Sequence, residues 1–248
     1  MDALGALELI AAALAVMIAY AVRGTAGFGG QTIAVPLLTL MMPITLVVAA
    51  VTVLTVASSL VHWLEDSRRI AWGEIARLLP FTLLGVVAGL YLFDVFDPGL
   101  LTRALGIFVV LYACIALLTA SRPVAAPARI LRPLGPVLSA AAGAIGTVFG
   151  GGAGPLYVIY LNSLRLEKDV FRVTITTILT FQAFVRVAGY VHLGFYDQSA
   201  FYLIALGFPM MLIGARLGHR IAGRIDQRRF NLGVGALLLA IGAGLYFK

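Results

Sequence analysis

Two arginines lie in or beside apolar segments of the chain, where a positive charge needs a partner. Arg186 stands about two thirds of the way along the apolar segment 170–194, and Arg23 directly follows the apolar segment 5–22. A charge near the centre of a bilayer costs at least about 2.5 kcal/mol, so we expect Arg186 to face water or an opposite charge. The acidic residues lie outside the apolar segments or near their ends, so a bound anion would supply that charge. The alternative is a structural Arg186, which bonds carbonyl groups of a broken helix or extends to the membrane surface.

Glycine-rich sequences interrupt the apolar segments at two places, 23–32 and 150–154. Glycine weakens a helix by about 1 kcal/mol relative to alanine, and unwound backbone within a membrane is tolerated only inside protein or beside a cavity. We therefore expect a cavity at the breaks, and after each break a new helix with Pro36 or Pro155 in or near its first turn. The free N–H groups at such a helix start suit an anion, whereas close packing through small residues is the alternative. The candidate binding residues here are Gly27, Gly29, Gly30, Gln31, Gly150, Gly151 and Gly152.

Hydroxyl side chains recur every three or four residues in two later segments, which would place them on one face of a helix. Thr55 and Thr177 belong to these stripes, and Gln182 follows the second stripe. We expect these three residues to add hydrogen bonds around the anion. His62, at the end of the first stripe, is a candidate for carrying a coupling proton because histidine titrates near neutral pH. The alternatives are that the hydroxyls bond their own helices and that His62 lies at the membrane surface.

Several classes of protein lack their signature in this sequence. There is no His-Glu-x-x-His, no Gly-x-Ser-x-Gly and no pair of aspartates within the apolar segments, so we do not expect an enzyme such as an intramembrane hydrolase. The single cysteine excludes an intrachain disulfide and a thiolate metal cluster, and we expect neither a metal nor a cofactor. A cation pathway lined by carboxylates is also missing, which favours anions or neutral solutes.

The composition indicates which elements hold these residues. Of the 248 residues 61% are hydrophobic and 12% are charged, against roughly 45–50% and about 25% in a soluble domain. A bilayer crossing takes about 20 apolar residues, so the chain allows at most about ten crossings and no separate soluble domain. The net charge of +7 is expected to reflect Lys and Arg in cytoplasmic loops rather than binding to nucleic acid. We predict an all-α polytopic membrane protein.

The chain divides into two similar halves. The motif Pro-x4-Gly-x3-Gly begins at Pro80 and again at Pro209, 129 residues later, and the same offset relates Gly106 to Gly235. A basic stretch that contains proline separates the halves, as is typical of a linker. We predict a first transmembrane repeat at 1–121, a cytoplasmic linker at 122–132 and a second transmembrane repeat at 133–248.

The distribution of basic residues predicts how the halves are oriented. With an odd number of crossings in each half, fourteen Lys and Arg residues lie on one side and two on the other, apart from Arg23 and Arg186. Such a bias marks the cytoplasmic side of a membrane. We therefore predict two inverted repeats, each a glycine-broken helical hairpin followed by three transmembrane helices, with both termini outside. Whether the hairpins cross the membrane fully or re-enter it stays open.

Three motifs carry a resemblance to a known family: the glycine-rich segment that ends in Val35-Pro36-Leu-Leu, its second copy at 150–156, and the repeated Pro-x4-Gly-x3-Gly. Over nearly its whole length the chain resembles the TauE/SafE sulfite exporter family. The resemblance implies a transporter in a bacterial or archaeal inner membrane that moves sulfite, sulfonates and related organosulfur anions. The first half departs from the family's fuller Gly-x-Gly-Gly-Gly pattern, because Gln31 follows Gly30. The substrate, the direction, the coupling ion and the oligomeric state therefore stay open.

We expect an alternating-access transporter that binds a small anionic solute between its two halves within the lipid bilayer. Arg186, with Arg23 beside it, would supply the positive charge. One alternative is an anion channel in which the same residues line a continuous pore. Another is a carrier of neutral or zwitterionic metabolites in which Arg186 is structural. A structural membrane subunit that binds no small molecule is the third.

Overall fold

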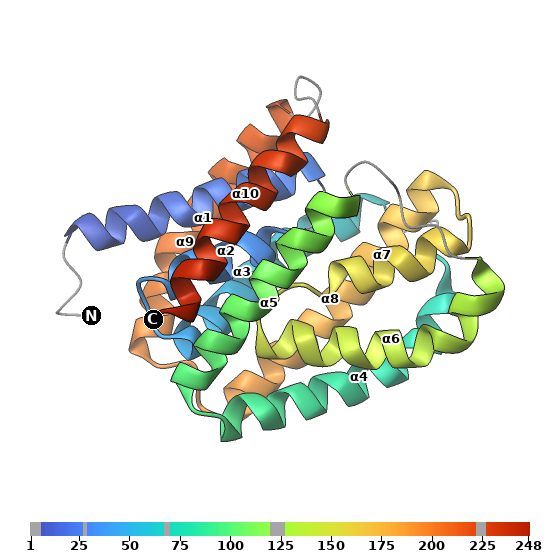
Figure 1. Ribbon diagram of the computed structural model, residues 1–248, viewed down its shortest axis with the longest axis horizontal. Helices are drawn as coiled ribbons and strands as arrows, with labels where there is room; N and C mark the ends of the chain where they lie inside the picture. Colours follow the sequence, from blue (N-terminus) through green and yellow to red (C-terminus); the bar gives the residue numbers. More distant parts are fainter. Residues whose placement is uncertain (1–5, 27–28, 67–69, 120–126, 222–226) are drawn as a thin grey trace.

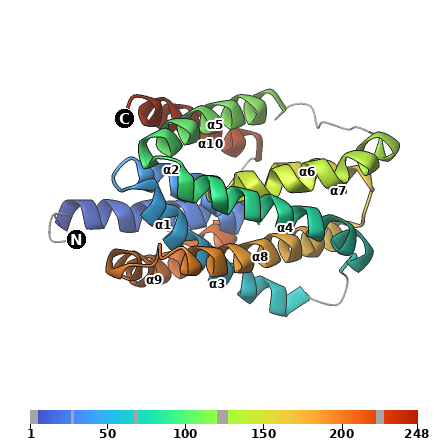
Figure 2. The same cartoon turned by 90° about the horizontal axis from the view of Figure 1, so that it is seen from below.

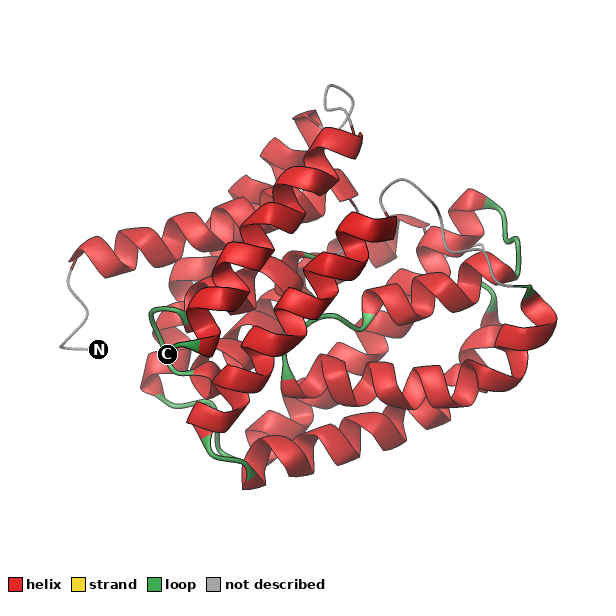
Figure 3. Cartoon of the chain, in the orientation of Figure 1, coloured by secondary structure: helices red, strands yellow, loops and turns green. Residues whose placement is uncertain are grey.

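A computed structural model describes residues 6–26, 29–66, 70–119, 127–221 and 227–248. Within these ranges the chain forms ten α-helices and no strand (Figures 1 and 3). The prediction of an all-α protein is confirmed. The helices are α1 (Ala6–Ala26), α2 (Gly30–Thr39), α3 (Ile44–Asp66), α4 (Trp72–Val95), α5 (Pro98–Thr119), α6 (Ala128–Val148), α7 (Gly154–Ser163), α8 (Lys168–His192), α9 (Gln198–Ile221) and α10 (Gln227–Tyr246).

Five of the described helices, α1, α4, α5, α8 and α9, are long and apolar enough to cross a membrane. Shorter apolar stretches lie in α3 and α10. Large apolar side chains on the outside of the molecule remain exposed, among them Leu84, Leu111 and Phe201. Lipid covers such side chains at no cost, and each helix satisfies its backbone hydrogen bonds internally. The chain is a polytopic membrane protein, as its composition predicted.

Both glycine-rich breaks separate a long helix from a short one. The first break lies between α1 and α2, where Gly29 has a φ of 91°. The second lies between α6 and α7, where φ is 68° at Gly150 and 83° at Gly152. Residues with a Cβ rarely adopt these left-handed conformations, whereas glycine does so without a steric penalty. The glycines therefore allow the chain to leave one helix and start the next within a few residues.

The prolines after the breaks occupy different places in their helices. Pro155 lies in the first turn of α7, as predicted. Pro36 lies inside α2, as the seventh of its ten residues, so it lies about one turn later than the predicted place in or near the first turn. The helix begins earlier because Gly30 follows the left-handed Gly29 directly and the residues from Thr32 to Val35 are already buried in helical positions. Packing thus decides where α2 begins.

The helices of the two halves contact each other in an exchanged order. α4 of the first half packs along α6 of the second, and α9 of the second half packs along α1 of the first. α3 contacts α8, α5 contacts α10, and Figure 2 shows α4 between α6 and α8. The first turn of α1 and the last turn of α10 lie at the same end of the molecule (Figures 1 and 2). The largest contacts between helices thus join elements from opposite ends of the chain.

The repeated Pro-x4-Gly-x3-Gly motif forms the tightest of these helix crossings. A Cβ built at Gly85 would overlap the Ala140 carbonyl of α6, and one at Gly218 would overlap the Ala21 carbonyl of α1. Gly106 of α5 likewise faces the backbone of α10 at Gly242. Small residues permit such close approach, which supplies the van der Waals contact that holds helices together in lipid. Most of the repeated glycines are therefore explained by packing.

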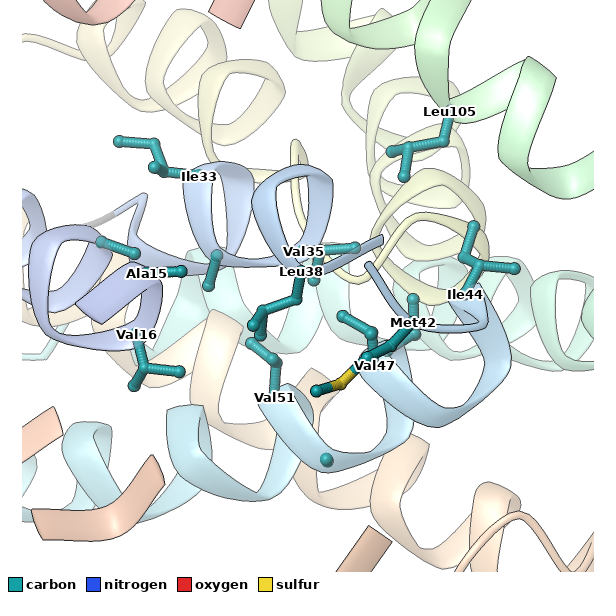
Figure 4. Packing of buried hydrophobic residues seen from close by; sticks show 14 of the residues in the cluster. Ala15, Val16, Ile33, Val35, Leu38, Met42, Ile44, Val47, Val51 and Leu105 are labelled. Atoms are coloured by element: carbon teal, nitrogen blue, oxygen red, sulfur yellow. The ribbon is translucent and has the colours of Figure 1, made fainter. Parts of the chain in front are cut away.

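A core of apolar side chains fixes the short helix α2 between its neighbours. Figure 4 shows Val16 of α1, Leu38 of α2 and Val51 of α3 close to one another, and all three side chains are fully buried. Lys248, at the end of the chain, donates hydrogen bonds to the carbonyl oxygens of Thr39 (2.8 Å) and Leu40 (3.1 Å). These bonds satisfy acceptors that the last turn of a helix leaves free. The orientation of α2 is thus fixed by its core contacts and by its carboxyl end.

Candidate functional site

The two breaks lie against each other and border a cavity. The Gly152 N–H of the second break donates a hydrogen bond of 3.3 Å to Thr32 Oγ1 of α2. A Cβ on Gly151 would lie 2.8 Å from the backbone nitrogen of Thr32, which no real contact allows. Glycine at this position therefore lets the two chain segments touch. The empty space at the cavity beside them, together with the open solvent at its mouth, is about 640 Å³.

Residues from both halves line this cavity. Helices α1, α2, α3, α5 and α8 contribute residues with side chains, and both breaks contribute glycines. Eight lining residues belong to the site predicted from the sequence: Arg23, Gly29, Gln31, Thr55, Gly151, Gly152, Gln182 and Arg186. Nine more complete the lining: Thr32, Ser59, Tyr112, Gly146, Ala153, Gly154, Pro155, Thr176 and Leu179.

Arg186 brings a buried positive charge to the cavity wall. Its exposed fraction is 2%. One terminal nitrogen donates a hydrogen bond of 2.7 Å to Thr52 Oγ1, and the guanidinium carbon lies 5.9 Å from the centre of the Tyr190 ring. The Nε atom of Arg186 is buried without a hydrogen-bond partner. The guanidinium thus has neutral neighbours, the Thr52 hydroxyl and Tyr190, and its unpartnered Nε–H leaves hydrogen-bonding capacity for a ligand.

Arg23 repeats this arrangement in the last turn of α1. Its terminal nitrogen donates a hydrogen bond of 2.8 Å to Ser59 Oγ, and its Nε is buried without a partner. The side chain packs over Gly30, where a Cβ would lie 3.1 Å from the Arg23 Cβ. Gly30 itself is buried and absent from the cavity lining, so it makes room for Arg23 instead of facing the cavity.

Both arginines bond to one polar stripe on α3. Thr52 accepts from Arg186, Ser59 accepts from Arg23, and Thr55 lies between them and hydrogen-bonds Tyr20 at 3.0 Å. Seven residues of helix correspond to about 10 Å along its axis, so the two hydrogen-bond acceptors are roughly 10 Å apart. Among the residues that the structure describes, no carboxylate forms an ion pair with either arginine. Two uncompensated positive charges therefore share one buried region.

The second polar stripe, on α8, does not take the role that the first stripe has on α3. Thr177 is fully buried, donates to the Val173 carbonyl of its own helix, and is absent from the cavity lining. Thr180 bonds the Thr176 carbonyl in the same way, and Thr174 accepts from the backbone N–H of Ala71. Thr176, which lies on a neighbouring face of α8, reaches the cavity instead. The prediction that Thr177 faces a ligand therefore disagrees with its position.

Two glutamine side chains reach the cavity with an unpartnered atom each. Nε2 of Gln31 is buried without an acceptor. Nε2 of Gln182 donates to the Ala142 carbonyl at 3.1 Å, whereas Oε1 of Gln182 is buried without a donor. A buried polar atom without a partner is rare in folded proteins and calls for an explanation. A ligand in the cavity would provide one.

Three predicted site residues fall elsewhere. Gly150 faces Val35 and Val48, where a Cβ would collide, so its position is explained by packing of the second break onto α2 and α3. Gly27 and the side chain of His62 lie outside the described residues. The coupling role of His62 therefore stays a prediction.

Two aromatic residues near the arginines had no signal in the sequence. Tyr112 of α5 lines the cavity, and Tyr190 of α8 stacks beside Arg186. A tyrosine in an apolar segment is ordinary in membrane helices, so only the fold distinguishes these two from the rest. Behind Arg186, Tyr190 packs against Phe93 and Phe195 with ring centres 5.3 and 6.2 Å away. These rings form an aromatic cluster beside Arg186.

Tyr196 lies in the loop between α8 and α9. Its hydroxyl donates a hydrogen bond of 3.1 Å to the Ala49 carbonyl of α3. Burial raises the pKa of Tyr196, so its phenol stays protonated and keeps this bond. The bond ties a loop of the second half to a helix of the first.

Comparisons with known proteins agree with this architecture. The model of the family described as sulfite exporter TauE/SafE matches residues 12–245. The chain is also 26% identical over 200 residues to the probable inner membrane transporter protein TsaS of Comamonas testosteroni, which covers 79% of this chain and 80% of that protein. No solved structure matches the chain. The chain is a multi-pass inner-membrane transporter and belongs to the TauE/SafE sulfite exporter family.

Proposed function

We propose that this transporter moves small sulfur-containing anions, such as sulfite, sulfonates and organosulfur acids, by alternating access through the cavity at the two breaks. One observation carries the proposal. Arg23 and Arg186 are both more than nine-tenths buried, each has a hydroxyl group as its hydrogen-bond partner, and the Nε of each is unpartnered. Leaving a charge buried without a counter-ion costs several kcal/mol. A bound anion offsets that cost.

The substrate class follows from the donors and from the relatives. Guanidinium groups match the planar arrangement of oxygens in carboxylates, sulfonates and similar oxyanions. The Nε2 of Gln31 adds a neutral donor to the same cavity. The family is described as sulfite exporters, and that description favours sulfur oxyanions over other anions of similar size.

Alternating access is supported by the arrangement of the two halves. Helix pairs between the halves exchange partners, α1 with α9 and α4 with α6, as two inverted repeats would. We further propose that the repeats comprise 1–121 and 133–248, joined by a cytoplasmic linker, and that the basic loops face the cytoplasm.

The proposal predicts saturable and selective transport in proteoliposomes. We expect the purified protein to exchange internal for external sulfite or sulfoacetate, because a carrier binds its substrate on each side in turn. A neutral sugar supplied at the same concentration should not move. Uptake that fails to saturate, and that proceeds without an exchanged anion, would indicate an anion channel. Equal uptake of the sugar and the anions would indicate a carrier without charge selectivity and contradict the proposal.

A further inference from the structure

The amide of Gln182 presents its oxygen, not its nitrogen, as the free group. Nε2 donates to the carbonyls of Ala142 (3.1 Å) and Gly143 (3.4 Å) on α6. Gly146 leaves the space that this nitrogen occupies, because a Cβ there would collide with it. Two carbonyl oxygens accept hydrogen bonds and cannot donate them, so they exclude the flipped amide. Oε1 is therefore the atom without a partner.

This orientation changes what Gln182 contributes to the site. As a donor it would add a hydrogen bond to an anion, which is the role that the sequence suggested. As an acceptor, its Oε1 atom repels an oxyanion and requires a hydrogen-bond donor on the ligand. Gln182 and Arg186 are four residues apart on α8, so they lie on the same face with Cβ atoms about 5–6 Å apart. The Oε1 atom of Gln182, which lacks a hydrogen-bond donor, thus lies on the same face of α8 as the guanidinium of Arg186, which lacks a counter-ion.

We propose that Gln182 selects sulfonates that carry a hydrogen-bond donor, a hydroxyl or an ammonium group, close to the anionic end. This inference rests on the proposed function and refines its substrate class. The sulfonate oxygens bind the guanidinium of Arg186, and the donor of the same molecule binds Oε1 of Gln182. Gln182 is thereby a residue that determines specificity. Such a ligand provides a partner both for Oε1 of Gln182 and for Nε of Arg186, the two unpartnered atoms on this face of α8.

Two probes of equal charge and nearly equal size test the inference. Isethionate is 2-hydroxyethanesulfonate, and 1-propanesulfonate replaces its hydroxyl with a methyl group. A solute that leaves a buried acceptor unpaired loses affinity, so we expect wild-type proteoliposomes to take up isethionate about tenfold more efficiently than propanesulfonate. In Gln182→Leu that ratio should fall to about one, because no acceptor remains.

The variants separate specificity from a merely structural role. Gln182→Met provides a second variant of similar volume in case Gln182→Leu fails to fold. The matched control is Gln198→Leu, which should keep the wild-type ratio because Gln198 is exposed on α9. A wild-type ratio near one would overturn the inference, and so would a Gln182→Leu or Gln182→Met protein that keeps the tenfold preference. If neither sulfonate and no sulfite moves, the proposed function itself fails, which is a different outcome.

Discussion

Arg186→Gln is expected to reduce the efficiency of anion uptake by about 30-fold or more. The substitution removes a buried charge that binds the anion, and losing one partner of such a pair costs about 2–5 kcal/mol, where each 1.4 kcal/mol is tenfold. The fold should persist, because Thr52 Oγ1 keeps its own hydrogen bond of 2.7 Å to the Val48 carbonyl. Initial rates of sulfite uptake over a range of concentrations measure the effect.

Two further variants make the effect of Arg186→Gln interpretable. Arg186→Lys keeps the charge and loses the planar set of donors, so its uptake should lie between those of wild type and Arg186→Gln. Arg103→Gln removes an exposed charge from α5 and should leave uptake unchanged. If Arg186 were structural, Arg186→Gln would lower the melting temperature instead. Normal, saturable uptake by a folded Arg186→Gln protein would contradict the assignment of Arg186 to the anion site.

Gly218→Val is expected to lower the free energy of unfolding by about 3 kcal/mol or more. Even the first carbon of the new side chain overlaps the Ala21 carbonyl, so α1 and α9 must separate along their crossing. For a chain of this length the melting temperature should fall by roughly 6–12 °C. Gly85→Val should act similarly at the crossing of α4 with α6, because Gly85 meets the Ala140 carbonyl. Thermal unfolding in detergent measures both variants.

The matched control for Gly218→Val is Gly233→Val. Gly233 is exposed on α10, and a Cβ there would meet no atom within 4 Å. Valine at that position should leave the melting temperature within about 2 °C of wild type, because surface substitutions change stability little. If Gly218→Val had the same melting temperature as Gly233→Val, the close approach of α1 to α9 in the structure would be wrong.

The helices were largely predictable because lipid imposes strong constraints. In the described part of the chain the long apolar segments form helices, and both glycine-rich interruptions are helix breaks. The glycines do this locally, through left-handed conformations such as that of Gly29, and need no distant partner. The place of Pro36 was predicted about one turn too early in α2, because the start of the helix depends on packing: the residues from Gly30 to Val35 are already helical and most of them are buried.

The cavity lining was predictable in its two arginines and in several residues of the breaks, but less so in its hydroxyl groups. Arg23 and Arg186 could be found because an arginine in an apolar segment is costly anywhere in the fold. Which of the hydroxyl residues face them could not be found, because Thr55 and Thr177 occur in equivalent stripes and only the contacts of α8 turn Thr177 toward its own helix. The role of Gln182 was reversed for a similar reason, since carbonyls 39 and 40 residues away in sequence decide which amide atom stays free.

The most direct test of an anion site at the two breaks is to locate a bound anion. Selenite is an analogue of sulfite, and the anomalous scattering of selenium would reveal its position in a crystal of the protein. We expect the selenium in the cavity beside Gly152, about 4 Å from the guanidinium of Arg186, which is the spacing of charge-assisted hydrogen bonds to its oxygens. Selenium bound only outside the cavity, at a concentration that saturates transport, would contradict the assignment of the site.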